Sequence, residues 1–284
     1  MPLKIHYISF PGLGIGEMKI NTNIIEIGNF RIPWYGLIIM TGIVCAFLYV
    51  WFRFKESGMN TDDVVDLALF VVPFGVLGAR LYYIIFRLDY YVVTTNDSFF
   101  ENLADSLGRM VAVWNGGLAI YGGIIAGGIA GVLVARHKKI KILTILDFLA
   151  PGVMLAQAMG RWGNFFNAEA HGGQTDIFLR MGIRLETSLN TYYYHPTFLY
   201  ESIWCFGLFC FLSWMDRSHR KFSGQIVCLY GILYSVERFF VEGLRTDSLM
   251  IGPLRQAQVI SLTLIAGCAL LYWILCRREN RKQI

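Results

Sequence analysis

Seven apolar segments, each about as long as a helix that crosses a bilayer, constrain this sequence more than any other feature. A bilayer core requires roughly 20 apolar residues per helix, and a spanning segment must satisfy its own backbone polar groups, which a helix does. The sequence therefore predicts an all-α polytopic membrane protein with seven transmembrane helices. These lie near residues 34–52, 64–86, 115–135, 142–160, 197–215, 225–242 and 255–276.

The composition agrees with this class. Hydrophobic residues make up 55% of the 284 residues and charged residues 16%, against about 25% charged residues in soluble domains. This excludes a disordered chain, a disulfide scaffold and an ordinary soluble enzyme. We expect one integral membrane domain over residues 1–284, with a loop at about 161–196 that is too long for a simple connector. The six cysteines lie in apolar segments without metal-ligand spacing, so we expect them to fill the core, and we predict no metal or other cofactor.

The basic residues predict how the chain crosses the membrane. The formal charge is +5, but lysine and arginine occur in short loops between apolar segments, which is typical of insertion topology and not of nucleic-acid binding. They are in excess after the first, third, fifth and seventh segments. The positive-inside rule therefore places the N-terminus outside and the C-terminus in the cytoplasm. On this topology, polar residues unusual for a membrane helix gather at the outer ends, at residues 34–35, 80, 115–121, 161, 195–201, 237–245 and 255–258.

The segment Gly160–Glu169 carries the most specific pattern. An arginine flanked by glycines can present its planar fork to a phosphate while the backbone approaches closely. Asn164 and Glu169 add groups that can orient the loop or a glycerol headgroup. Arg161 alone is also explained as an arginine that reaches up to lipid headgroups. The whole ten-residue arrangement favours a binding site.

A second polar group occurs in the segment at 225–242. Tyr234, Arg238, Glu242 and Arg245 are spaced at i, i+4, i+8 and i+11, which predicts that they share one helix face. Such charges within a membrane are costly unless structure or function requires them. An internal Arg238–Glu242 pair can hold helices together, and it can also hold one arginine while another meets an anionic substrate. Glu237 lies about 100° around the helix, and we expect it to bond a neighbouring helix.

Three further features have two interpretations each. Gly123, Gly127 and Gly131 form GxxxG steps, which close helix packing explains. The phenol of Tyr121 either bonds a substrate and relays a proton or belongs to an interfacial aromatic belt. Glu201 is predicted to be a buried carboxylate that needs a partner, and His195 is either a base or an ordinary turn residue.

These motifs, in this order, resemble the prolipoprotein diacylglyceryl transferase family. The segment Gly160–Glu169 matches the family signature Gly-Arg-x-Gly-Asn-Phe-x-Asn-x-Glu. The match continues at residues 34–36, 78–80, 195–197, 200–201, 237–247 and 257–261. The resemblance implies a multi-pass enzyme of the bacterial cytoplasmic membrane whose active site faces the outer leaflet. Such an enzyme transfers the diacylglyceryl group of phosphatidylglycerol, a membrane lipid, to the lipobox cysteine in the signal peptide region of a preprolipoprotein. A thioether forms and glycerol-1-phosphate leaves.

The resemblance also implies residue roles. The arginine of the family that contacts phosphatidylglycerol corresponds to Arg161, and its second essential arginine corresponds to Arg238. Several family members have histidine where this chain has Tyr121, and tyrosine, with an ordinary pKa near 10, is a poor base. Either Tyr121 positions a substrate or that histidine is not an obligatory base. Other functional positions of the family are matched by Tyr35, Asn164, Gly172, Tyr234 and Glu242.

The expected chemistry needs no cysteine of this chain, because the nucleophile belongs to the protein substrate. We expect Arg161 to hold the lipid phosphate, and Arg238, held by Glu242, to assist departure of the phosphate. A multispan transporter or lipid flippase is the main alternative, but it predicts polar residues through the bilayer midplane and at both ends of the helices. A purely structural subunit would not need two arginines and a glutamate on one helix face.

Overall fold

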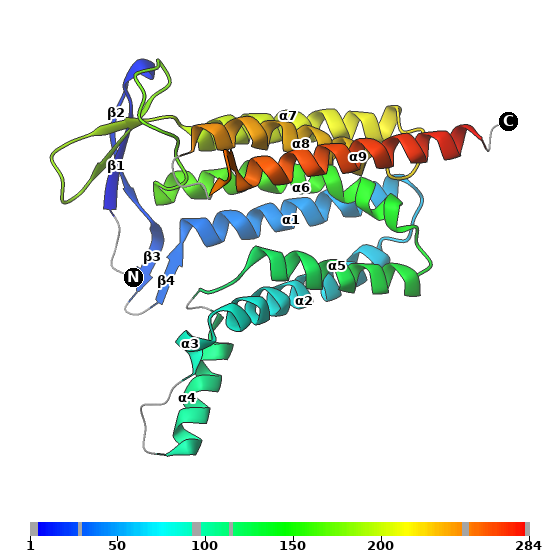
Figure 1. Ribbon diagram of the computed structural model, residues 1–284, viewed down its shortest axis with the longest axis horizontal. Helices are drawn as coiled ribbons and strands as arrows, with labels where there is room; N and C mark the ends of the chain where they lie inside the picture. Colours follow the sequence, from blue (N-terminus) through cyan, green and yellow to red (C-terminus); the bar gives the residue numbers. More distant parts are fainter. Residues whose placement is uncertain (1–4, 28–29, 93–97, 114–115, 246–249, 282–284) are drawn as a thin grey trace. The chain divides into compact units, whose positions relative to one another are not determined.

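The computed structural model describes residues 5–27, 30–92, 98–113, 116–245 and 250–281 (Figure 1). Residue 115 of the expected third span and residues 246–247 of the family-like motif lie outside these ranges. The chain divides into two compact units, one formed by residues 1–53 and 143–284 and the other by residues 54–142.

Each predicted apolar segment forms a helix in the structure. Six of the described helices are long and apolar enough to cross a membrane. The remaining expected span, the sixth in chain order, is α8, which has 20 residues but includes Glu237, Arg238 and Glu242. The seven helices are α1 (Trp34–Glu56), α2 (Asp62–Phe86), α5 (Ile120–His137), α6 (Ile142–Asn167), α7 (Thr197–Ser218), α8 (Gln225–Leu244) and α9 (Gln256–Asn280).

A small antiparallel sheet, which the apolar pattern did not predict, caps one end of the helices in the first unit (Figure 1). Its strand order is β2-β1-β5-β6, and Ile8 pairs with Ile183 in register. The apolar side chains of the sheet pack on Phe165 of α6 and Phe198 of α7. We call this end of the helices the sheet end and the opposite end the far end. The strands are β1 (Ile5–Phe10), β2 (Ile15–Asn21), β5 (Met181–Leu185) and β6 (Tyr192–Tyr194).

Two short hairpins and a single turn complete the first unit. The strands β3 (Asn23–Ile27) and β4 (Phe30–Pro33) pair just before α1, and β7 (Met250–Ile251) pairs with β8 (Leu254–Arg255) just before α9. A 3-10 turn, η1 (Pro11–Leu13), connects β1 to β2. Both hairpins lead directly into a long helix, so they fix where α1 and α9 begin.

At the far end, the Asp147 carboxylate of α6 caps the first turn of α8. It accepts hydrogen bonds from the backbone N–H groups of Gly224 (2.7 Å), Ile226 (2.9 Å) and Val227 (3.0 Å). A carboxylate is favourable at a helix N-terminus, where backbone N–H groups lack partners within the helix. Asp147 is fully buried, so this cap fixes the start of α8 on α6.

Glycines let α2 and α5 pack closely in the second unit. A Cβ atom on Gly78 would lie 2.6 Å from the carbonyl oxygen of Gly122, and one on Gly127 would lie 3.3 Å from that of Val71. The first approach leaves no room for a side chain, and the second would need α2 and α5 to move apart by a few tenths of an ångström. For Gly127, the predicted explanation by close helix packing is therefore confirmed. The second unit also contains the short helix α3 (Leu88–Tyr91) and the amphipathic helix α4 (Phe99–Val111).

Arg80 of α2 organises the loop that precedes α5. Its guanidinium is buried and donates to the carbonyl oxygens of Met110 (2.8 Å) and Arg109 (2.7 Å), and also to those of residues 112, 116 and 117. It also lies over the ring of Tyr91, 4.9 Å from the centroid. Arg80 is one of the polar residues that the sequence predicts at the outer helix ends. These contacts give it a structural role within its own unit.

Candidate active site

The signature segment is mostly helical. We predicted that the fourth helix ends near residue 160 and that a loop covers 161–196, but α6 continues to Asn167 and the loop begins after it. The physical reason is that both phenylalanines of the added turns find packing partners. Phe165 packs in the core beneath the sheet, and Phe166 stacks on Trp34 with ring centroids 4.7 Å apart. Arg161 is therefore held by a helix and not by a flexible loop.

Two arginines from different helices meet one buried carboxylate at the sheet end. Arg161 of α6 forms an ion pair with Glu201 of α7. Arg238 of α8 approaches the other oxygen of Glu201, with 3.6 Å between Nη1 and Oε1. The Glu201 side chain is only 1% exposed. The predicted need of Glu201 for a partner is confirmed, but its place between both arginines required the three-dimensional packing.

Arg238 also pairs with Glu242 on its own helix. The distance from Nη2 of Arg238 to Oε2 of Glu242 is 2.7 Å, so the predicted Arg238–Glu242 pair is confirmed. We call Arg161, Glu201, Glu237, Arg238 and Glu242 the sheet-end cluster. The arginine side chains are 17% and 22% exposed and the paired carboxylates 1% and 6%. A ligand therefore has more access to the guanidinium groups than to the carboxylates.

Tyr234 accompanies the cluster, whereas Arg245 leaves its helix face. Tyr234 interacts electrostatically with Arg161 and Arg238, and its ring stacks on Tyr230 with centroids 5.8 Å apart. The expectation that Arg245 continues this face is wrong, because α8 ends at Leu244 and Arg245 has extended backbone angles (φ −77°, ψ 150°). Its backbone instead forms a bridge with Gly172.

Gly172 lets the loop after α6 run between two helix ends. Its N–H donates to the carbonyl of His195 (3.0 Å), and the N–H of Gly173 donates to that of Leu244 (2.9 Å). A Cβ atom on Gly172 would lie 2.7 Å from the Cβ of His195 and 3.2 Å from the Leu244 oxygen. A side chain at this position would therefore push the start of α7 away from the end of α8, where the cluster lies.

The remaining predicted residues of the first unit lie near the end of α6. The ring of Tyr35 packs against Gly163, where a Cβ atom would lie 2.6 Å from the ring. Asn164 follows Arg161 by three residues, so the two share a helix face. Glu169 is exposed and accepts a hydrogen bond from Nδ2 of Asn167 (3.0 Å). These contacts place the three residues around the helix end that holds Arg161.

Tyr121 belongs to the second unit. It is the second residue of α5, and its side chain is 53% exposed. Its part in the reaction stays a prediction. In the described part of the chain, no group of three or more His, Cys, Asp or Glu side chains is arranged to hold a metal ion.

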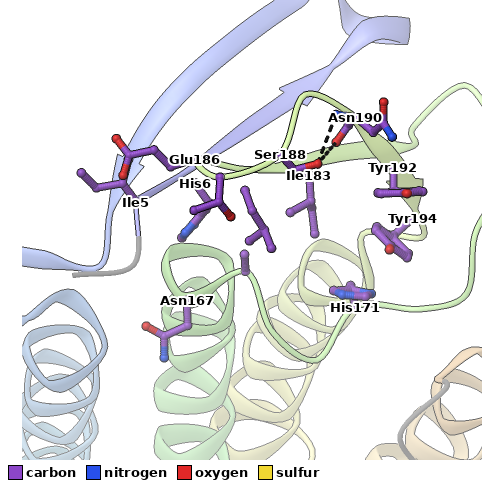
Figure 2. Close-up of a pocket in the computed structure, with 13 residues that line it drawn as sticks. Ile5, His6, Asn167, His171, Ile183, Glu186, Ser188, Asn190, Tyr192 and Tyr194 are labelled. Carbon is purple, nitrogen blue, oxygen red and sulfur yellow. Dashed lines mark hydrogen bonds between the residues drawn. The ribbon is translucent and has the colours of Figure 1, made fainter. Parts of the chain in front are cut away.

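A pocket of about 570 Å³ lies between the sheet and the end of α6 (Figure 2). Figure 2 shows His171 beside Tyr194, and their ring centroids are 4.0 Å apart. Asn167 contributes to both the signature and this pocket, so the pocket adjoins the segment that carries Arg161. Its lining combines aliphatic, aromatic and polar side chains, with Glu186 as the one carboxylate. It consists of Ile5, His6, Asn167, Ala168, His171, Ile183, Leu185, Glu186, Thr187, Ser188, Asn190, Tyr192 and Tyr194.

Comparisons with known proteins identify the family of this chain. A family model described as prolipoprotein diacylglyceryl transferase matches residues 22–274. A relative from Clostridioides difficile, named phosphatidylglycerol–prolipoprotein diacylglyceryl transferase, is 42% identical over 256 residues, which cover 89% of this chain and 94% of the relative. Relatives of the same name from Clostridium novyi and Listeria innocua are 43% and 39% identical, covering 84% and 89% of this chain and 90% and 89% of their own lengths. The family model spans most of the chain, and the relatives match over nearly their whole length. This chain therefore belongs to the prolipoprotein diacylglyceryl transferase family.

Proposed function

We propose that this chain is the enzyme that transfers the diacylglyceryl group of phosphatidylglycerol to the lipobox cysteine of preprolipoproteins. The reaction forms a thioether, releases glycerol-1-phosphate and begins bacterial lipoprotein maturation. The observation that carries the proposal is the convergence of Arg161 and Arg238, from two helices, on buried Glu201. Family membership and the printed names of the relatives support the same substrates.

We further propose that all seven long helices cross the bacterial cytoplasmic membrane as one transferase domain. The N-terminus and the sheet end would face outward and the C-terminus the cytoplasm, as the basic loops predict. The length of α8, 20 residues, corresponds to about 30 Å and matches a bilayer core. Two of its three charged residues are compensated, since Arg238 pairs with Glu242 and also with Glu201 of α7. The active site would then face the outer leaflet.

The partly exposed guanidinium groups are suited to the lipid phosphate. Arginine presents a planar fork of donors that matches phosphate oxygens. Glu201 pairs with Arg161 through one oxygen and with Arg238 through the other, and both arginine side chains are more exposed than Glu201. We assign Arg161 to the phosphate and Arg238, positioned by Glu242, to the departing oxygen.

The reaction is a displacement at a glycerol carbon. The cysteine sulfur of the substrate bonds to that carbon, the carbon–oxygen bond to phosphate breaks, and its electron pair passes to the phosphate oxygen. The leaving group gains negative charge as it departs. Two arginines already held in place can neutralise this charge without reorganisation, and such preorganised stabilisation is a main source of catalysis.

The other predicted residues are assigned to substrate contact and placement. Asn164 and Tyr234 lie beside the arginines and are assigned to the headgroup, and Tyr121 is assigned to substrate positioning. The pocket beside Asn167 and His171 is assigned to the polypeptide that follows the modified cysteine, because its aliphatic and aromatic side chains suit peptide side chains and its polar groups suit a peptide backbone. The full set of assigned substrate-binding residues is Tyr35, Arg161, Asn164, Glu169, Gly172, Tyr234 and Arg245.

The test uses the purified full chain in detergent with phosphatidylglycerol and a lipobox peptide. Glycerol phosphate release is followed for the parent, for Arg161→Ala and for Tyr121→Phe, with a peptide that has serine for cysteine as the control. We expect release that requires the peptide cysteine and is lost in Arg161→Ala. Full activity of Tyr121→Phe would show that the phenol hydroxyl is not needed for proton transfer. A folded parent that releases nothing would contradict the proposal and favour a lipid transporter.

A further inference from the structure

Glu237 is a buried carboxyl group without a hydrogen-bond partner at the centre of the proposed site. It is 5% exposed, and both oxygens lack a hydrogen-bond partner among the described residues. The prediction that it bonds a neighbouring helix is therefore wrong for the described chain. It interacts electrostatically with Glu201, Arg161 and Arg238. Glu237 therefore feels the charges of the sheet-end cluster but takes part in none of the ion pairs described there.

The charges of the cluster decide the state of Glu237. Arg161 and Arg238 are already paired with Glu201 and Glu242. A third ionised carboxylate, buried and without a hydrogen bond, would be strongly unfavourable. The arriving lipid phosphate adds a further negative charge to the same pair of arginines. A neutral carboxyl group is therefore the form that fits this position.

We propose that Glu237 is protonated in the resting enzyme and carries the thiol proton to the leaving phosphate. This inference rests on the proposed transferase function. It assigns a catalytic residue for the proton, for which the sequence offered Tyr121 and His195 as candidates. A protonated carboxyl has one oxygen that donates and one that accepts, and both Glu237 oxygens are free to do so.

The proton balance closes without a change of charge on Glu237. The sulfur–carbon bond forms while the carbon–oxygen bond breaks, and the electron pair moves to the phosphate oxygen. The carboxyl O–H gives its proton to that oxygen, and the other carboxyl oxygen takes the proton of the thiol. Glycerol phosphate leaves as the monoanion, and Glu237 is protonated again for the next turnover.

Titratable groups from three helices surround Glu237. They are Arg161 of α6, Glu201 and Cys205 of α7, and Tyr234, Arg238 and Glu242 of α8. Of the three carboxyl groups, Glu201 and Glu242 have guanidinium partners. Cys205 is buried among apolar side chains of the helix core. Glu237 is thus the carboxyl in this set that is not engaged in an ion pair.

The kinetic test compares Glu237→Gln and Glu237→Ala with the parent and with Ser235→Ala, a buried neighbour on α8 as control. We expect Glu237→Gln to lower kcat by about 100-fold or more, the usual range for acid–base groups, with the KM for phosphatidylglycerol nearly unchanged. Added formate should partly restore Glu237→Ala, because a small acid can replace the missing carboxyl. Full kcat in Glu237→Gln, or a loss confined to KM, would overturn the proposal.

An infrared measurement tests the resting state without turnover. The parent should show the carbonyl stretch of a protonated carboxyl that is absent from Glu237→Gln, and its absence in the parent would overturn the proposal. The two measurements separate the possible failures. If the parent is active and Glu237→Gln is equally active, only the role of Glu237 is refuted. If the parent is inactive but shows the carbonyl stretch of a protonated carboxyl, the transferase function is refuted while the protonation of Glu237 is supported. If Glu237→Gln does not fold, isotope-edited infrared of the parent, with labelled glutamate, still shows whether any glutamate is protonated, and the absence of such a band would overturn the proposal.

Discussion

The helices of the first unit carry arginine–carboxylate clusters at both ends, and the two differ in what they leave unpaired. At the far end, Asp216 binds Nε of Arg53 at 2.7 Å through one oxygen and Nη1 of Arg220 at 3.0 Å through the other. Both guanidinium groups also lie over the ring of Phe148, at 5.1 and 4.9 Å. We call these four residues the far-end cluster.

The difference supports a structural role for the far-end cluster and the proposed catalytic role for the sheet-end cluster. Asp216 is completely buried, and each of its oxygens has an arginine partner. The sheet-end cluster has a surplus of carboxyl groups, two partly exposed arginines and Glu237 without a hydrogen bond. Arginine and carboxylate residues therefore stabilise helix packing at the far end. At the sheet end the same residue types leave groups that, on the proposed function, are available to a ligand and a proton.

The largest expected effect on stability is at the far end. Asp216→Ala would leave Arg53 and Arg220 without their carboxylate partner, and breaking a buried pair costs about 3–5 kcal/mol. Chemical unfolding in mild detergent should show a free energy of unfolding lowered by about this amount. The transferase rate per folded molecule should stay at the parent value. A stable variant with a lowered rate would mean that the far-end cluster acts in catalysis.

At the sheet end, removing an arginine should reduce the rate more than the stability. Arg238→Ala should lose about 100- to 1000-fold in kcat, since it removes a preorganised donor for the leaving group. Arg53→Ala is the matched control, because it also removes one arginine from an ion pair and should leave the rate per folded molecule unchanged. Equal rate losses in both variants would erase the distinction between the two clusters.

Glu201 should show opposite effects on binding and turnover. Glu201→Gln removes the carboxylate that competes with the lipid phosphate for Arg161 and Arg238, so the KM for phosphatidylglycerol should fall. The arginines also lose their common anchor, so kcat should fall by about 10-fold, the signature of a positioning role. Steady-state kinetics at varied lipid concentration measures both. A raised KM with unchanged kcat would show that Glu201 contributes only to binding.

The pocket should affect the peptide substrate alone. Tyr194→Ala removes a ring that stacks on His171, so the KM for the lipobox peptide should rise several-fold, in line with the loss of one aromatic contact. The KM for phosphatidylglycerol should not change. Leu189→Ala, which changes a 97% exposed residue between β5 and β6, is the control. An unchanged peptide KM in Tyr194→Ala would exclude the pocket as the polypeptide site.

The smallest effect concerns an ion pair across the sheet. Arg184 binds both carboxylate oxygens of Glu17, at 2.6 and 3.0 Å, and this hydrogen bonding lowers the pKa of Glu17 below its usual value. A lowered pKa in the folded state stabilises the fold above the unfolded pKa, and the contribution is lost as pH falls through the folded pKa. Glu17→Gln should slightly lower the Tm at pH 7 and match the parent at strongly acidic pH. A gap that persists in acid would contradict this assignment.

The seven long helices were predictable because each is encoded locally as a run of about 20 apolar residues, whereas α3 and α4 have no such run and were not predicted. The end of α6 was not, since Arg161, Asn164 and Asn167 interrupt that run although the helix continues. The sheet was also missed, because β1 and β5 are short and far apart in sequence, and no local pattern specifies such a pairing. At the site, the Arg238–Glu242 pair follows from helix spacing, but the choice of Glu201 as the partner of Arg161 depends on how α6 packs against α7.

The attachment of α8 at both ends has a consequence for its lipid environment. Asp147 holds its first turn, the Gln258 side chain donates to the Phe239 carbonyl at 3.3 Å, and Gly173 donates to Leu244. A helix fixed in this way cannot slide along its axis to match a thicker or thinner bilayer. If α8 spans the membrane as proposed, the protein sets the depth of Arg238, and the bilayer must adjust around it. The rate of transfer should then depend on lipid chain length and be greatest where the hydrocarbon thickness brings the phosphate to the level of the two arginines.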